Sequence, residues 1–154
     1  MHQDYLQRAI ELACFNVQNG GGPFGALIVQ DQRIIAASGN RVTENLDPTA
    51  HAEILAIRQA CEYLSDFQLK NCVLYTSCEP CPMCLGAIYW SRLSAVYFAS
   101  NRLDASQAGF DDSFIYTEID KPAEQRQIPM RHLATAGADQ PFRLWHANND
   151  KIGY

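Results

Sequence analysis

Two short segments, Asp47-Pro48-Thr49-Ala50-His51-Ala52-Glu53 and Pro80-Cys81-Pro82-Met83-Cys84, decide how this chain folds. The first has the polar residues typical of a helix start, and apolar residues at helical spacing follow it to about Leu64. The second comes shortly after the apolar run Val73–Thr76 and begins another helical pattern that ends near Ser91. A helix, a buried strand and a second helix in succession are therefore predicted, with each segment at the start of a helix.

The flanking sequence adds one helix and three strands. Apolar residues at helical spacing predict a helix over residues 4–19, and the glycines and proline that follow end it. Two apolar runs, Ala26–Val29 and Ile34–Ala37, are joined by a short polar turn and predict a β-hairpin. Ala95–Ala99 predicts a further strand. The order α-β-β-α-β-α-β favours a three-layer α/β/α architecture with a central mixed sheet.

The pattern is looser beyond Asn101, where Ser113–Ile119 and Pro141–Ala147 are the two candidate helices. Neither an internal repeat nor a linker divides the chain. We therefore expect residues 1–154 to form a single domain, of which about 121–154 is a C-terminal segment with less regular structure.

Composition bounds the compartment and the partners. The chain has no apolar run long enough to span a bilayer and no basic start followed by an apolar block, so we expect a cytoplasmic protein that does not bind membranes. Its net charge of −5 argues against a nucleic-acid partner, because binding to phosphates needs a basic surface. A small-molecule partner is favoured.

His51, Cys81 and Cys84 offer one imidazole and two thiolates, which are preferred zinc ligands. Three protein ligands leave a fourth tetrahedral position open, as in catalytic zinc sites. Zinc held in this way lowers the pKa of bound water to about 7. A carboxyl group must then move a proton from that water to the leaving amine, and Glu53, two residues from His51, is the candidate general acid–base. H-x-E followed by P-C-x-x-C is a signature of zinc-dependent nucleobase deaminases.

Two other metal sites would use the same residues. Cys78 could complete a closed structural zinc site, with Glu53 only a charge at a helix N-terminus; the chain would then be a non-catalytic, zinc-stapled interaction module. An iron–sulfur cluster is less compatible with the sequence, because no cysteine follows Cys84 to complete a ferredoxin-type run.

Over nearly its whole length the chain resembles the cytidine-deaminase-like superfamily, and within it the bacterial guanine deaminases. The likeness is carried by four blocks: Gly21–Ala26, Asp47–Glu53, Tyr75–Trp90 and Ala108–Tyr116. The first three are partly shared with tRNA adenosine deaminases, whereas the fourth, with the Glu118–Pro122 that follows it, is typical of the guanine branch.

This resemblance implies hydrolysis of guanine to xanthine and ammonia by one zinc ion per chain, in purine catabolism or salvage. It also implies contacts to the base: aromatic walls, an asparagine on the purine edge, a carboxylate on the guanine edge, an alanine beside the acid–base and a C-terminal residue that closes the site. The matching positions are Phe24, Trp90, Asn40, Asp112, Ala52 and Tyr154. Asp111 is adjacent to Asp112, so the register of this pair is open.

The family further implies a homodimer in which C-terminal segments are exchanged and each tail covers the partner's site. The alternatives within the same chemistry are a tRNA adenosine deaminase and a deaminase of another free base or of an aminotriazine. The acidic net charge of −5 favours a free base over tRNA.

Overall fold

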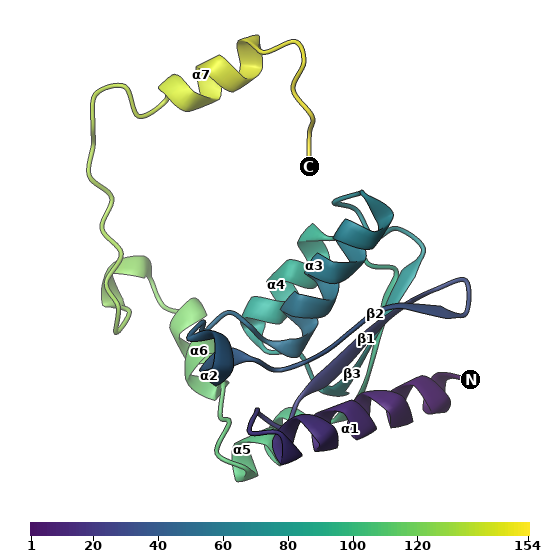
Figure 1. The fold of residues 1–154 in the computed structure, drawn as a ribbon. Coiled ribbons are helices and arrows are strands. Elements are labelled where there is room, and N and C mark those ends of the chain that lie inside the picture. Colours follow the sequence, from purple (N-terminus) through teal and green to yellow (C-terminus); the bar gives the residue numbers. More distant parts are fainter. The chain divides into compact units, whose positions relative to one another are not determined.

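A computed structural model describes residues 1–154, which form two compact units, Met1–Ser113 and Phe114–Tyr154. The first unit is built on a four-stranded sheet with strand order β2-β1-β3-β4 (Figure 1). In chain order its elements are α1 (His2–Gln18), β1 (Gly25–Gln30), β2 (Arg33–Gly39), α2 (Val42–Asn45), α3 (Ala52–Leu64), β3 (Cys72–Cys78), α4 (Pro82–Trp90), β4 (Ala95–Ser100) and α5 (Arg102–Gln107).

The sheet is mixed, as the sequence predicts. β1 pairs antiparallel with β2 and with β3, whereas β3 and β4 are parallel. The β1–β2 turn is only Asp31 and Gln32, both with positive φ (48° and 64°), which is typical of a tight hairpin turn. The parallel pair needs a crossover connection, and α4 supplies it.

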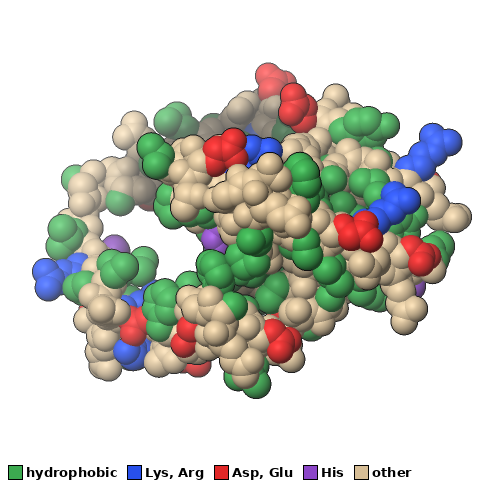
Figure 2. Space-filling model, turned by 60° about the horizontal axis from the view of Figure 1, so that its bottom comes forward, with side chains coloured by type: hydrophobic (Ala, Val, Ile, Leu, Met, Phe, Trp, Pro, Cys, Tyr) green, Lys and Arg blue, Asp and Glu red, His purple; other side chains and the backbone are tan.

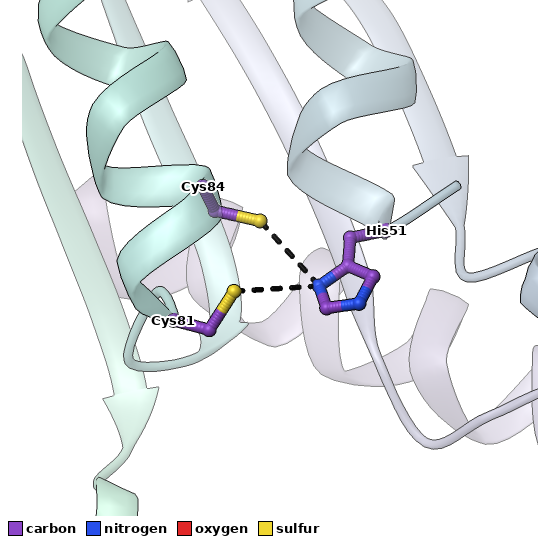
Figure 3. A group of neighbouring side chains, drawn as sticks. All are labelled: His51, Cys81 and Cys84. Atoms are coloured by element: carbon purple, nitrogen blue, oxygen red, sulfur yellow. Dashed lines mark hydrogen bonds between the residues drawn. The ribbon is translucent and has the colours of Figure 1, made fainter. Parts of the chain in front are cut away.

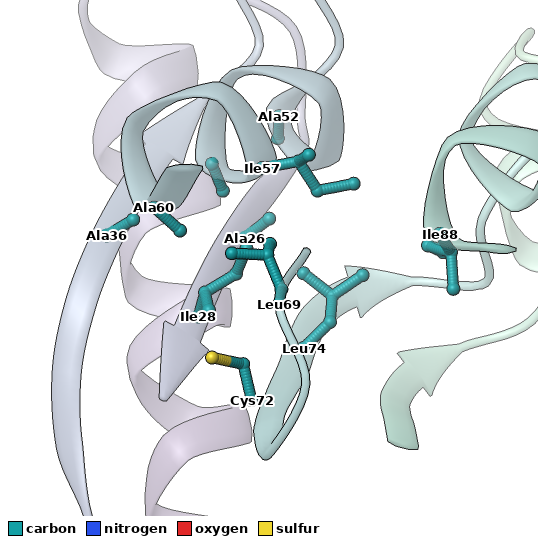
Figure 4. Packing of buried hydrophobic residues seen from close by; sticks show 11 residues of the cluster. Ala26, Ile28, Ala36, Ala52, Ile57, Ala60, Leu69, Cys72, Leu74 and Ile88 are labelled. Atoms are coloured by element: carbon teal, nitrogen blue, oxygen red, sulfur yellow. The ribbon is translucent and has the colours of Figure 1, made fainter. Parts of the chain in front are cut away.

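Helices cover both faces of the sheet because alternate strand residues point to opposite sides. Ile28 and Leu74 are fully buried in a cluster with α3 side chains such as Ala60 (Figure 4). Their strand neighbours Leu27 and Tyr75 pack on the other face against Ala9 of α1. The predicted three-layer arrangement is confirmed.

The strand register brings four chain segments together at one end of the strands. Gly25 at the start of β1 pairs with Gly39 at the end of β2, and Cys78 at the end of β3 pairs with Ser100 at the end of β4. The residues before β1 and after β2, β3 and β4 therefore meet there. In sheets with parallel strands, ligand sites form outside the carboxyl ends of the strands.

Two short helices were not predicted. α2 has four residues and α5 has six, too few for apolar periodicity to reveal. A local signal for α5 did exist: Asn101 and Asp104 form a reciprocal capping box at its N-terminus.

The second unit follows Ser113, the first residue of α6 (Ser113–Ile119), and contains a 3₁₀ turn, η1 (Ala123–Gln125), and α7 (Gln140–Ala147). Both helices agree with the sequence prediction. No residue from 114 to 154 is buried, and hydrophobic side chains are exposed on both units, some of them on the face shown in Figure 2. None of the helices combines the length and the apolar character that a membrane span requires.

Candidate active site

The three predicted metal ligands stand at the N-termini of two helices on the same face of the sheet. His51 is the N-cap residue of α3 and Cys81 is the N-cap residue of α4, with Pro82 at the first helical position. Cys84 lies one turn further along α4 and is buried. Figure 3 shows the three side chains turned toward one another across the gap between the helices.

The distances between these side chains fit a zinc ion. His51 Nδ1 lies 3.5 Å from Cys81 Sγ and 3.6 Å from Cys84 Sγ, and all three candidate ligand atoms are within 4.8 Å of one another. In a tetrahedral zinc site with bonds of about 2.0 Å to nitrogen and about 2.3 Å to sulfur, the nitrogen lies roughly 3.6 Å from each sulfur. The donor set and its spacing therefore match a zinc site built from one imidazole and two thiolates.

The cysteine pair is already polarised toward metal binding. The pKa of the Cys81 thiol is lowered to about 4, chiefly because Cys84 donates a hydrogen bond to it, with His51 contributing further. The pKa of Cys84 is raised, since it holds the shared proton and is buried. One sulfur is thus a thiolate near neutral pH, and metal binding displaces the proton from the other.

Glu53 lies beside the ligands and is almost fully enclosed, with 5% of its surface exposed. Thr76 Oγ1 donates to one carboxylate oxygen at 3.5 Å, and Cys84 Sγ approaches the other at 3.6 Å. Burial raises the pKa of this carboxyl group. A buried carboxyl with a raised pKa next to a metal site is suited to accept and return a proton near neutral pH.

Cys78 is not part of the ligand cluster. Its Sγ donates to the carbonyl of Asn101 at 3.7 Å, and burial raises the pKa of its thiol to about 11. The ligand atoms that lie within 4.8 Å of one another belong to His51, Cys81 and Cys84 and not to Cys78, which argues against a closed four-ligand site.

The turn that carries Cys81 is fastened to the start of α5. Glu79 N–H donates to Ser100 O at 2.8 Å, and the Glu79 carboxylate accepts from Arg102 N–H at 3.1 Å. These bonds hold the end of β3 against the end of β4, so the sheet fixes the position of the first thiolate.

Three predicted base contacts lie at the same end of the strands as the metal ligands. Ala52 is fully buried between His51 and Glu53. Asn40 follows β2 directly, and its N–H donates to Phe24 O at 3.0 Å. The Phe24 ring meets Phe110 edge to face, with centroids 5.0 Å apart. Phe110, for which no role was predicted, thus supports the predicted aromatic wall.

Asp111 and Asp112, which follow α5, have different surroundings. Asp111 Oδ1 accepts from Ser113 N–H at 2.9 Å, and bonds to Ser113 lower its pKa, so this carboxylate is engaged at the start of α6. Asp112 is partly buried, which raises its pKa, and it lies close enough to Cys81 for the thiolate charge to act on it. A hollow of about 450 Å³ is lined by both aspartates together with Glu79 and Arg102. This geometry favours Asp112 over Asp111 as the carboxylate of the base site.

Trp90 does not lie among the metal ligands. It ends α4, six residues beyond Cys84, which is about 9 Å along the helix axis. The residue is 63% exposed. Tyr154 belongs to the second unit. Both base contacts remain predictions.

Residues 1–100 match the family of the cytidine and deoxycytidylate deaminase zinc-binding region, and the chain belongs to this family. It is 56% identical to guanine deaminase of Bacillus subtilis over 99% of each chain. The X-ray structure of guanine deaminase from Bacillus subtilis superposes with a TM-score of 0.99, covering 100% of this chain and 99% of the other. The tRNA-specific adenosine deaminase of Aquifex aeolicus is 37% identical over 88% of this chain and 87% of its own. The predicted cytidine-deaminase-like fold and the zinc cofactor are confirmed.

The two readings of Cys78 predict different metal contents. If His51, Cys81 and Cys84 are the only protein ligands, Cys78→Ala retains one zinc per chain, measured by elemental analysis after dialysis. Cys81→Ala serves as the matched control and loses most of the metal, since a two-ligand site binds zinc weakly. Loss of zinc from both variants would contradict the three-ligand site.

Proposed function

We propose that this chain catalyses the hydrolytic deamination of guanine to xanthine and ammonia. One observation carries this proposal: a His51–Cys81–Cys84 site with a buried Glu53 lies in a chain that is 56% identical, over 99% of both lengths, to a guanine deaminase. The protein is then a hydrolase that acts on a cyclic amidine, in purine catabolism or salvage.

Zinc, when bound, supplies a water of low pKa as the nucleophile. Every other step is the work of the protein. Glu53 takes the proton from the nucleophile and delivers it to the amino group that leaves as ammonia, and the raised pKa of its carboxyl suits both directions of transfer. Thr76 orients this carboxylate through its hydroxyl group. Because Glu53 and Thr76 are both buried, bulk water does not compete for the proton.

The base is placed by residues outside the metal signature. Phe24, supported by Phe110, offers an aromatic wall to the flat purine. Asn40 offers an amide to the edge that carries the 6-oxo group, and Asp112 accepts from N–H groups of guanine. These roles and that of Ala52 are supported by the resemblance together with the placement described above, whereas those of Trp90 and Tyr154 rest on the resemblance alone.

A tRNA adenosine deaminase is the second candidate, because one such enzyme is 37% identical to this chain. Two observations favour the free base. The identity to the guanine deaminase is higher, at 56%, and extends over the C-terminal part as well. The net charge of −5 is also unsuited to a polyanionic substrate.

We also propose that the protein is a homodimer with exchanged C-terminal segments, in which residues 121–154 cover the partner's site. Tyr97 and Phe98 of the edge strand β4 point to opposite faces, yet they are 37% and 45% exposed, so neither face of this strand is fully covered. The tail likewise contains no buried residue although it carries Phe142, Leu144 and Trp145 on α7. Apolar surfaces of this extent call for a partner. We expect the dimer to act in the cytoplasm.

The substrate is tested by measuring ammonia release from guanine, ammeline, adenine, cytosine and their nucleosides, and inosine formation in tRNA. Guanine should give the highest kcat/KM, with xanthine as the product. Preferential formation of inosine in tRNA would instead establish the second candidate. If no base releases ammonia, the site is a non-catalytic zinc module.

Glu53→Gln tests the proton transfer. The amide cannot accept and return a proton, so turnover should fall by at least about 10²-fold, the usual contribution of a general acid–base. One zinc per chain should be retained, since Glu53 is not a ligand. A variant that keeps both its zinc and more than a tenth of wild-type turnover would contradict the role of Glu53.

Segment exchange is tested by mixing two impaired variants. Glu53→Gln has a defective site and an intact tail, whereas Tyr154→Ala has an intact site and a defective tail. If tails are exchanged, one site of every heterodimer contains both intact parts, so an unfolded and refolded 1:1 mixture should recover about a quarter of wild-type activity. A mixture no more active than the average of the two pure variants means that each tail serves its own chain.

A further inference from the structure

Asn16, near the C-terminal end of α1, ties together two loops that are far apart in the sequence. Its Nδ2 donates to Gly22 O at 2.8 Å and to Asn40 O at 2.7 Å. A primary amide has two N–H donors, so both are used on these carbonyls. The backbone carbonyl of Asn16 also accepts from Gly21 N–H at 2.8 Å. One side chain therefore fixes the loop before β1 to the residue after β2.

The packing around this amide is unusually close, because glycines face it from both loops. A Cβ on Gly21 would lie 2.4 Å from Asn16 Nδ2, and a Cβ on Gly39 would lie 2.5 Å from Asn16 Cγ. Real side chains do not approach so closely, so only glycine fits at either position while Asn16 keeps its place.

Asn40 is held by three contacts besides the bond from Asn16. Its N–H donates to Phe24 O at 3.0 Å, and its Oδ1 accepts from Val42 N–H at 3.3 Å. Gly22 packs against Oδ1, since a Cβ there would lie 3.1 Å away. The Oδ1 atom is thus engaged within the loop, and the Nδ2 group carries the N–H donors that the Asn40 amide can offer to a ligand.

A backbone hydrogen bond connects the residue after Asn40 to the residue before the zinc ligand His51. Arg41 N–H donates to Ala50 O at 2.9 Å, and Ala50 immediately precedes His51. A shift of Asn40 would therefore move the amide that binds the purine edge relative to the zinc ligand His51. Displacements of about 1 Å at such positions lower enzymatic rates by up to about 10²-fold.

We propose that Asn16 is a positioning residue for substrate recognition, which holds the Asn40 amide so that its Nδ2 donates to the 6-oxo oxygen of the purine. This inference rests on the proposed function, because it presupposes that Asn40 reads the base. Asn16 does not touch the substrate. It acts through Asn40, so its contribution should vanish when the Asn40 side chain is absent.

A double-mutant cycle tests this dependence with guanine as substrate. Asn16→Ala should lower kcat/KM about tenfold, the equivalent of roughly one hydrogen bond, mainly through a higher KM. In an Asn40→Ala background the same change should cost less than about twofold. Zinc content should stay at one per chain in all variants. Asn19→Ala is the matched control: the Nδ2 of this C-cap residue donates to Phe15 O of α1 at 2.8 Å and to neither loop, so kcat/KM should be unchanged.

Two further variants keep the test decisive if Asn16→Ala fails to fold. Asn16→Asp preserves the shape but, as a carboxylate, has no donor for either carbonyl. Gly39→Ala keeps the Asn16 side chain but adds a Cβ that displaces its amide. Both should raise KM for guanine and give the same non-additivity with Asn40→Ala. Losses that multiply across the cycle, or no loss at all in an active enzyme, overturn the role of Asn16. Failure of the wild type to deaminate guanine overturns the proposed function instead.

Discussion

The structure depends on holding the N-termini of two helices so close that an imidazole and two thiolates can share one metal ion. His51 begins α3 and Cys81 begins α4, 30 residues apart in sequence, yet their ligand atoms are 3.5 Å apart. The sheet makes this possible, since both helices pack on one of its faces and β3 leads directly into the turn that carries Cys81. The bonds from Glu79 to the start of α5 prevent that turn from moving away.

Enclosing these groups has an energetic cost that the metal offsets. Glu53 and Cys84 are buried, and a buried ionised group is strongly destabilised unless it is paired or bound to a cation. Without metal, the pKa of Cys84 is raised by its hydrogen bond to Cys81 and by burial, and the pKa of Glu53 is raised by burial, so the protonated forms of both groups are favoured. A divalent cation favours the thiolate of Cys84, so metal binding and folding stabilise each other. The same enclosure shifts the pKa of Glu53 upward, in the direction that proton transfer near neutral pH requires.

The metal site defines the reaction but not the base. Its residues lie in the zinc-binding region that defines the family, and the chain is similar both to a guanine deaminase and to a tRNA-specific adenosine deaminase. Discrimination must come from the loops around it. Asn40 and Phe24 are joined by a backbone hydrogen bond and held by Asn16, and Asp112 approaches from the loop after α5. We therefore propose that substrate choice depends on the positions of these loops rather than on the catalytic groups.

The sequence by itself determined the elements and the chemistry. The longer helices and the strands of the first unit follow from local apolar periodicity, and the ligands and Glu53 follow from residue type and spacing. The helices α2 and α5, with four and six residues, were missed because they are too short for a repeating apolar pattern to show. Only the tertiary structure decided which distant residues meet. It showed Thr76 on Glu53, Phe110 on Phe24 and Asn16 on Asn40, and it placed Trp90 at the far end of α4. Such contacts depend on strand register and helix packing over tens of residues, and no local pattern in the sequence encodes them.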